Sequence, residues 1–356
     1  MPAKRCSVEV VILERSRLPS RLLPLLSIVY AVSVVVFWLV IRYLGDRWWP
    51  ATVLLFVPRW PILLPLVILL PLSARLKKLF WLPILTTLFV FTQLMGLSVP
   101  WQRLLSHAPA GQSLRVLFCN VHWNELNTPA FDQYLQASRP QVVLLEDFAP
   151  RDLSPRLKDP RWHRYQLGQI FIASVFPIEH VHDLHLERIK GEEEGVIAHY
   201  TGAAACFDLQ TPAGPFHVVN IHLASPHAGL RTVFRNLKDG IWRLNANSTR
   251  RWNESQVIHD WIATQPGPLI AAGDFNTPAE SPIYRHFWAD YPDAFPTAGI
   301  GLGFTHLSPL SELRIDHLIT APGVTCNGYL VGPPCGTPHR PVVVDLVIKL
   351  WSPVSQ

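Results

Sequence analysis

Two long apolar runs near the start of the chain constrain its fold more than any other feature of the sequence. The run LLPLLSIVYAVSVVVFWLVIRYL (22–44) carries no charge before Arg42, and the run LFWLPILTTLFVFTQLMGLSV (79–99) carries none. A helix of about 20 apolar residues crosses the hydrocarbon core of a bilayer. Both runs are therefore predicted transmembrane helices. The chain is 49% hydrophobic, and these runs near the N-terminus account for the excess of apolar residues.

A third run, WPATVLLFVPRWPILLPLVILLPL (49–72), is long enough to span but contains Arg59 and five prolines. An arginine near one interface can extend its charged end into water, so the helix proper is expected to begin near Arg59. We predict three spans, 22–44, 50–72 and 79–99, within a membrane anchor of residues 1–105. A cleavable signal peptide is the alternative for the first run, but that run exceeds the roughly 7–15 apolar residues of such peptides.

The segments that flank these runs carry unequal charge. Five basic residues precede the first run and three lie in the loop 73–78, whereas the loop 42–50 holds Arg42 and Arg47 beside Asp46. The excess of basic residues in cytoplasmic loops places the N-terminus and the second loop in the cytoplasm. With three spans, the chain after about residue 100 would lie outside the cytoplasm. This predicts a multi-pass protein of the cell inner membrane, and losing the middle span would reverse the orientation.

The net charge of +5 and the pI near 9.0 could suggest a nucleic-acid-binding protein, but the charge is unevenly distributed. Residues 1–112 hold 12 of the 31 Lys and Arg and 3 of the 26 Asp and Glu, which leaves 19 basic against 23 acidic residues for the rest. The basic excess thus belongs to the predicted anchor. A mildly acidic domain argues against a broad phosphate-binding surface, although a nuclease needs only a local basic groove.

Four cysteines follow the apolar runs. Cys119 and Cys206 fall in strand-like segments and are interpreted as small buried residues. Cys326 and Cys335 flank a loop rich in Gly and Pro, and in an oxidising compartment they could pair. No cysteine spacing resembles a zinc site.

Short apolar segments separated by turn residues follow a linker at 106–113. Eight of them are predicted strands, and helical patterns fit between some of them at 129–138, parts of 228–263 and 279–289. Several strands are apolar on both faces, as in sheets covered by other layers. The pattern predicts a layered α/β domain over residues 113–349. The predicted strands are 114–120, 141–147, 169–174, 203–209, 216–223, 268–274, 314–320 and 341–348.

Polar side chains recur where these strands end, and one histidine precedes the last strand. Such positions gather at one rim of a sheet, where binding sites are usually built. Carboxylates, amides and histidines without a serine or cysteine nucleophile suit Mg²⁺, or Mn²⁺, which takes oxygen ligands and can activate water at a phosphate ester. A histidine held by an acid can then transfer a proton. The residues are Asn120, Glu146, Asn220, His222, Asp274, Asn276, Asp316 and His339.

The segments CNVHWN, LLED, NIHL, GDFN, IDHLI and HRPVVVDL occur in this order between residues 113 and 349. The set resembles the endonuclease/exonuclease/phosphatase superfamily, the DNase I-like fold. The resemblance implies a four-layer sandwich of two β-sheets flanked by helices, and metal-dependent hydrolysis of phosphodiester or phosphomonoester bonds. It leaves the substrate open between nucleic acid, a lipid headgroup and a small phosphoester.

The resemblance also implies roles for individual residues. Asn120 and Glu146 match the metal positions, with Glu146 the main Mg²⁺ ligand and Asp147 a competing one. The remaining matches are catalytic: His222 contacts the scissile phosphate, Asp274 and Asn276 orient the attacking water and the phosphate, and Asp316 hydrogen-bonds the second histidine, His339.

One motif departs from the pattern. The superfamily usually has Ser-Asp-His before the last strand, whereas this chain has Thr337-Pro338-His339. Proline offers no carboxylate, which leaves one or two metal positions open. The alternative function is a catalytically impaired, membrane-tethered binding protein that keeps the fold.

Overall fold

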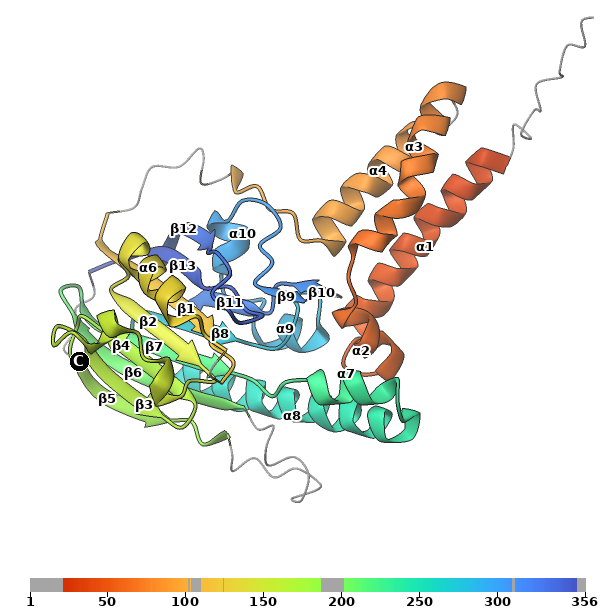
Figure 1. Ribbon diagram of the computed structural model, residues 1–356. Helices are drawn as coiled ribbons and strands as arrows, with labels where there is room; N and C mark the ends of the chain where they lie inside the picture. Colours follow the sequence, from red (N-terminus) through yellow and green to blue (C-terminus); the bar gives the residue numbers. More distant parts are fainter. Residues whose placement is uncertain are drawn as a thin grey trace, which may run out of the picture.

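The computed structural model describes residues 22–350 except 78, 102, 104–109, 124, 187–201, 309 and 310. Figure 1 shows two parts: a group of helices that projects from one end, and a layered domain of strands and helices. We call residues 22–99 the helical region. The linker predicted at 106–113 lies mostly outside the described residues.

The helical region is built from α1 (Leu22–Leu44), α2 (Trp49–Phe56), α3 (Leu64–Leu76) and α4 (Trp81–Phe89), which a π-helical turn extends to Leu94. Only α1 among the described helices is by itself long and apolar enough to cross a membrane. The middle candidate bends by 83° between Trp49–Phe56 and Trp60–Leu76, and the helix Trp81–Leu94 is shorter than a full span. Three spans therefore stay a prediction.

Arg59 lies at the bend in the middle candidate. The following helical segment starts at Trp60, as expected, but the arginine side chain does not extend into solvent. Its guanidinium donates hydrogen bonds to the carbonyls of Leu54 and Leu55, with 2.8 Å from Nη2 to the Leu55 oxygen. These carbonyls at the end of α2 lack intrahelical donors, so Arg59 satisfies them and stabilises the break.

The layered domain contains two mixed sheets. The first has the strand order β12-β13-β1-β2-β4-β3, in which only β1 and β2 are parallel. Its strands are β12 (Val324–Val331), β13 (Val342–Ile348), β1 (Gln112–Asn120), β2 (Val142–Glu146), β4 (Ile170–Ser174) and β3 (His163–Leu167). The second has the order β11-β8-β7-β6-β5, in which only β7 and β8 are parallel. Its strands are β11 (Asp316–Thr320), β8 (Leu269–Asp274), β7 (Gly214–His222), β6 (Ala203–Thr211) and β5 (Ile178–Asp183).

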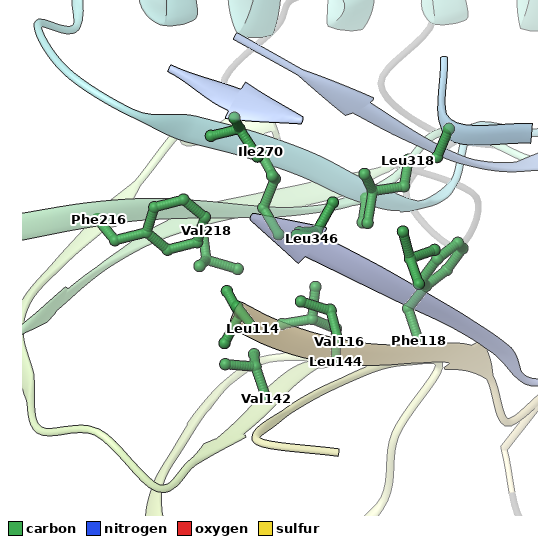
Figure 2. Packing of buried hydrophobic residues seen from close by; sticks show 14 of the residues in the cluster. Leu114, Val116, Phe118, Val142, Leu144, Phe216, Val218, Ile270, Leu318 and Leu346 are labelled. Carbon is green, nitrogen blue, oxygen red and sulfur yellow. The ribbon is translucent and has the colours of Figure 1, made fainter. Parts of the chain in front are cut away.

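The two sheets face each other across the main hydrophobic core (Figure 2). Phe118 and Leu144 of the first sheet meet Val218 and Ile270 of the second, and each is fully buried. Burial of one such side chain stabilises the fold by about 1.5–3 kcal/mol. Helix α6 (Thr128–Ser138) covers the outer face of the first sheet, and α8 (Leu237–Thr264) and α9 (Pro282–Phe287) cover that of the second. The expected four-layer sandwich is confirmed.

All eight predicted strands occur, and the helical patterns correspond to α6, α7 (His227–Val233), α8 and α9. The strands that the sequence did not indicate are β3, β5, β12 and the two-stranded sheet of β9 (His306–Ser308) and β10 (Ser311–Leu313). β3 and β5 are edge strands with mostly exposed or half-buried side chains, so they lack the apolar run used for prediction. Cys326 and Cys335 are both buried and free, so the pairing considered for them does not form.

Candidate active site

The functional residues expected from the sequence come together at one end of the two sheets. The parallel pair β1 and β2 ends with Asn120 beside Glu146, and the parallel pair β7 and β8 ends with His222 beside Asp274. β11 begins at Asp316, which lies directly opposite Asp274 in the antiparallel register. Carboxyl ends of parallel strands share one edge of a sheet, which is why residues far apart in sequence converge here.

Asp316 and His339 form a buried ion pair. Both oxygens of Asp316 lie 3.0 Å from Nδ1 of His339, and Asp316 also accepts a 2.6 Å hydrogen bond from the Thr305 hydroxyl. Burial alone would lower the pKa of His339, but the carboxylates of Asp316 and Asp274 outweigh it and raise that pKa to about 9. Burial opposes ionisation of Asp316, yet His339 holds the pKa of Asp316 below its ordinary value. The pair is therefore charged near neutral pH, with the imidazolium ready to contact an anionic group.

Asp274 lies at the centre of the cluster. Its Oδ2 accepts hydrogen bonds from the side-chain amides of Asn120 at 3.0 Å and Asn276 at 3.1 Å, and it lies 3.7 Å from Nε2 of His339. Burial raises the pKa of Asp274 to about 6; His339 opposes this shift and Asp316 adds to it. A carboxylate with such a pKa can accept a proton near neutral pH.

Asn276 is held in a left-handed backbone conformation with φ of 47°. Its backbone N–H donates to Oδ1 of Asp274 at 2.8 Å, and its side-chain amide also donates to the Leu223 carbonyl at 2.8 Å. These bonds tie the loop after β8 to the loop after β7. They fix Asp274 and Asn276 relative to each other.

His222 faces the same cluster from β7. Its Nδ1 lies 3.2 Å from Oε1 of Gln169 and 3.6 Å from Asp147. Its Nε2 lies 3.4 Å from the amide nitrogen of Asn120 and 3.8 Å from Asp274. Nε2 is thus directed toward the centre of the site.

Glu146 is fully buried, and no described residue makes a hydrogen bond to either carboxylate oxygen. Burial raises the pKa of Glu146 well above its ordinary value; the nearby Asp316 and Asp274 add to the shift, and the adjacent side chain of Asn220 opposes it. A buried carboxylate without a donor is costly unless it is protonated or meets a cation. Its environment therefore fits a divalent metal ion.

Asn220 strengthens this assignment. Its amide nitrogen donates to the carbonyls of Leu145 and Phe171, both at 3.3 Å, which orients its oxygen the other way. That oxygen also has no donor among the described residues. A Cβ built on Gly273 would lie 3.0 Å from this oxygen and 3.0 Å from Oε1 of Glu146, so both oxygens border the same point beside Gly273. The sequence placed Asn220 at a strand end but gave it no role.

Two further residues of the site could not be recognised from the sequence. His306 lies with its ring centroid 4.8 Å from that of His339, and burial together with His339 lowers the pKa of His306 to about 4. Thr305 holds Asp316 through its hydroxyl. Both residues precede or begin the short strand β9, and only the tertiary fold brings them to Asp316 and His339.

At Pro338, where the resemblance leads us to expect an acid, the surrounding bonds still hold His339 in place. The hydroxyl of Thr337 donates to the Asn120 carbonyl at 3.2 Å and accepts from the N–H of His339 at 3.1 Å. The carbonyl of Pro338 accepts from the Leu307 N–H at 2.9 Å. The backbone around His339 is therefore fixed without a carboxylate at position 338.

Gly273, one residue before Asp274, cannot accept a side chain. Its φ is +129°, and a Cβ would lie 2.1 Å from the Ile221 carbonyl. We expect Gly273→Ala to lower the free energy of unfolding by about 3 kcal/mol or more, since strain and a backbone clash act together. Thermal unfolding of the purified protein measures this.

Gly168→Ala is the control. Gly168 has φ of +56° with no atom within 4 Å of the added Cβ, so its free energy of unfolding is expected to fall by only about 1 kcal/mol. Equal losses of unfolding free energy in the two variants would contradict the predicted clash at Gly273.

Comparison with known proteins identifies the family of the chain. Residues 117–339 match the model of the Endonuclease/Exonuclease/phosphatase family. No curated protein matches the chain by sequence. The structure is similar to a humanised D. rerio TDP2 (16% identity, 66% of this chain and 98% of that chain, TM-score 0.47). It is also similar to an endonuclease/exonuclease/phosphatase family protein from Bacteroides thetaiotaomicron (17% identity, 68% of this chain and 100% of that chain, TM-score 0.48). A third similar structure is that of ANGEL2, a 2′,3′-cyclic phosphatase (13% identity, 67% of this chain and 97% of that chain, TM-score 0.48). The family model covers more than half of the chain, and it shows that the chain belongs to the endonuclease/exonuclease/phosphatase family, whose members hydrolyse phosphoester bonds.

Proposed function

We propose that this protein is a membrane-anchored hydrolase that cleaves phosphodiester or phosphomonoester bonds with the help of a divalent metal ion, Mg²⁺ or Mn²⁺. The observation that carries the proposal is the buried cluster at the sheet ends. It combines an Asp316–His339 ion pair, a central Asp274 and a buried Glu146 carboxylate for which the described residues form no well-aligned hydrogen bond. A negatively charged phosphate ester needs these positive, proton-accepting and metal-binding groups at one place.

The metal would be held by Glu146 and Asn120, with the oxygen of Asn220 as a further candidate. The Asn120 oxygen accepts from the His122 N–H at 2.9 Å, which leaves one of its lone pairs for a metal, and its amide nitrogen faces Asp274. Hard cations such as Mg²⁺ take oxygen ligands, usually one or two carboxylates and several waters. When bound, the metal neutralises charge on the phosphate and lowers the pKa of water.

The other residues position the phosphate and the water. The imidazolium of His339, held by Asp316, donates a hydrogen bond to the phosphate and stabilises charge that develops on it. His222 contacts the phosphate from strand β7. Asp274 accepts a proton from the attacking water, and Asn276 fixes the orientation of Asp274 through the two hydrogen bonds between them.

Membrane anchoring is supported by the surface of the helical region. Only 17% of the apolar window of α1 is buried, whereas the core helix of a soluble protein would be mostly buried. The large apolar side chains of α3 and α4 are also exposed, among them Val67, Ile68, Leu85 and Leu88. Such a surface is unfavourable in water and favourable in lipid. We propose that α1, α3 and α4 insert together as a multi-pass anchor, with the catalytic domain outside the cytoplasm.

Hydrolysis of bis-p-nitrophenyl phosphate by the full-length protein in detergent tests the function. We expect turnover with Mg²⁺ or Mn²⁺, none with EDTA, and at least a roughly hundredfold loss in Asp274→Ala, because general base catalysis contributes about 10²–10⁴-fold. Activity that survives EDTA would exclude the metal mechanism. No turnover of this compound, of labelled nucleic acid or of labelled lipid headgroups by a folded protein would instead support the binding-protein alternative.

A further inference from the structure

The guanidinium of Arg251 connects the helical region to the loop that carries Asn276. Arg251 lies on α8 and is fully buried. Its Nη1 donates to the backbone carbonyl of Asn276 at 3.0 Å, its Nε donates to Oδ1 of Asn247 at 2.9 Å, and its Nη2 donates to Oδ1 of Asp46 at 2.7 Å. All three nitrogens of the guanidinium are thus engaged at once.

Asp46 comes from the turn between α1 and α2. Its side chain is almost fully buried, and its backbone is left-handed with φ of 57°. The second carboxylate oxygen of Asp46 accepts a hydrogen bond from the hydroxyl of Ser281, the N-cap residue of α9. One carboxylate of the helical region therefore holds both ends of the segment 276–281, directly at Ser281 and through Arg251 at Asn276.

The placement of this acid is not a consequence of a generally acidic region. Asp46 is the only Asp or Glu in the sequence between residues 22 and 99, whereas Arg and Lys occur there six times, at 42, 47, 59, 75, 77 and 78. Burying a charge is unfavourable unless it is paired and hydrogen-bonded. Asp46 lies where its charge compensates that of the buried Arg251. It is next to the segment 276–281, which we call the catalytic loop.

The same bonds reach the loop after β7. Asn247, which accepts from Arg251, donates through its amide to the carbonyls of Ala224 at 3.2 Å and Ser225 at 2.9 Å. These two residues closely follow His222 in the chain. A shift of Arg251 would therefore disturb the supports of both Asn276 and His222.

A second contact of the helical region reaches the other half of the site. Ser98 and Gly301 form an isolated antiparallel bridge, with N–H to carbonyl distances of 2.9 and 3.0 Å. Leu302 and Phe304 pack against the apolar cluster of the helical region. Thr305, the next residue, donates to Asp316.

From these contacts we propose that the helical region is part of the support of the active site, and that Asp46 is a positioning residue for catalysis that acts through Arg251. The proposal rests on the hydrolase function proposed above. Misplacement of a catalytic group by about 1 Å can cost about a hundredfold in rate. Loss of the Asp46 carboxylate frees Arg251, and with it the carbonyl of Asn276 and the geometry at Asp274.

Asp46→Ala in the full-length protein in detergent tests the proposal with bis-p-nitrophenyl phosphate and metal. We expect kcat to fall roughly 10- to 100-fold with KM changed less than about threefold, because substrate contacts remain while the catalytic loop shifts. Asp46→Asn keeps the shape of the side chain and one hydrogen-bond acceptor. Its kcat is expected to lie between those of the Asp46→Ala variant and the original protein.

The matched control is Arg285→Ala. Arg285 also bridges to the helical region, through the Arg42 carbonyl at 3.1 Å and the Tyr43 ring. Its guanidinium is not hydrogen-bonded to the catalytic loop within the described part of the chain. The kcat of this variant should therefore stay within about twofold of the original value.

A double variant separates positioning from stability. Asp46→Ala leaves a buried arginine without its counter-charge and is expected to lower the melting temperature. Asp46→Ala with Arg251→Met removes both charges and should recover stability, because apolar replacement of a buried pair is often tolerated. The kcat of the double variant should stay low, since the Asn276 carbonyl has lost the hydrogen bond from Arg251.

The outcomes are distinct. A folded original protein that turns over neither this compound nor labelled nucleic acid nor labelled lipid headgroups would refute the hydrolase function, and with it the catalytic role of Asp46. An active original protein with unchanged kcat in Asp46→Ala, or a double variant that regains full kcat together with stability, would show that the pair is only structural and overturn the proposal.

Discussion

Replacement of Glu146 by glutamine is expected to lower kcat/KM by at least about a thousandfold and, at the same time, to stabilise the metal-free protein. A metal ion contributes several kcal/mol to the stabilisation of charge in the transition state, which corresponds to about three orders of magnitude in rate. Glu146 is the buried carboxylate that has no donor among the described residues of the site. Glutamine has the same shape but no charge to offer a cation.

The gain in stability follows from the raised pKa of Glu146. An acid whose pKa is higher in the folded than in the unfolded protein loses stability as the pH rises above the unfolded value, and regains it as the pH falls. At neutral pH with EDTA, the Glu146→Gln variant should therefore have a free energy of unfolding that is higher by about 1–3 kcal/mol. The difference should vanish at about pH 4, where the carboxyl is largely protonated in both states.

Addition of Mg²⁺ should reverse the order of stability. A ligand that binds only the folded state stabilises it in proportion to the logarithm of its concentration over Kd. The melting temperature of the original protein is expected to rise with Mg²⁺, while that of the Glu146→Gln variant stays constant. Asp147→Asn is the matched control, because Asp147 is adjacent and lies 3.6 Å from Nδ1 of His222. It should lose only about tenfold in activity and keep the response to metal. A larger loss of activity in Asp147→Asn than in Glu146→Gln would indicate that Asp147, and not Glu146, is the metal ligand.

The sequence predicted the strands of this domain well because most of them are buried on both faces. β2, β4 and β8 are buried at every position, so each forms an apolar run that ends abruptly in a polar residue. Those abrupt endings revealed Glu146 and Asp274. Strands with exposed or half-buried side chains, such as β5 and β12, carry no such signal.

The sequence could not predict contacts between segments that lie far apart. Nothing near Asp46 indicates a partner 205 residues later, and Arg251 lies in a helix whose charged residues suggest an exposed face. Arg59 was expected to reach water, but the carbonyls that end α2 are closer and need donors. In each case the deciding quantity is the satisfaction of a buried polar group, which becomes visible only when the tertiary structure is known.

Asp316→Asn is expected to lower kcat by about 10²–10⁴-fold and to move the alkaline limit of activity to lower pH. The acid that holds a catalytic histidine fixes its tautomer and stabilises its charge, and the corresponding amide substitution in a catalytic triad costs about 10⁴-fold. The introduced amide could turn its nitrogen toward Nδ1 of His339, which favours the wrong protonation state. The hydroxyl of Thr305 would still have an acceptor in the amide oxygen, so the local fold should persist.

The direction of the pH effect follows from the charges around His339. Its pKa is about 9, above the ordinary 6.5, because the Asp316 and Asp274 carboxylates outweigh the effect of burial. The protonated form, and the stability it contributes, is complete below about pH 6.5 and is lost as the pH rises through about 9. Activity that needs the imidazolium should therefore fall on the alkaline side near pH 9. In Asp316→Asn the strongest stabilising charge is gone, and the decline should occur at least about one pH unit lower.

A pH–rate profile of kcat/KM, measured from about pH 5 to 10 with saturating metal, provides the test. Thr305→Val is the matched control, since it removes the hydroxyl donor to Asp316 but leaves the carboxylate beside His339. Its alkaline limit should shift by less than in Asp316→Asn, because the ion pair persists. An alkaline limit that stays in place in Asp316→Asn would mean that another group titrates there. His339 would then act without its proton, as an acceptor rather than as a donor to the phosphate.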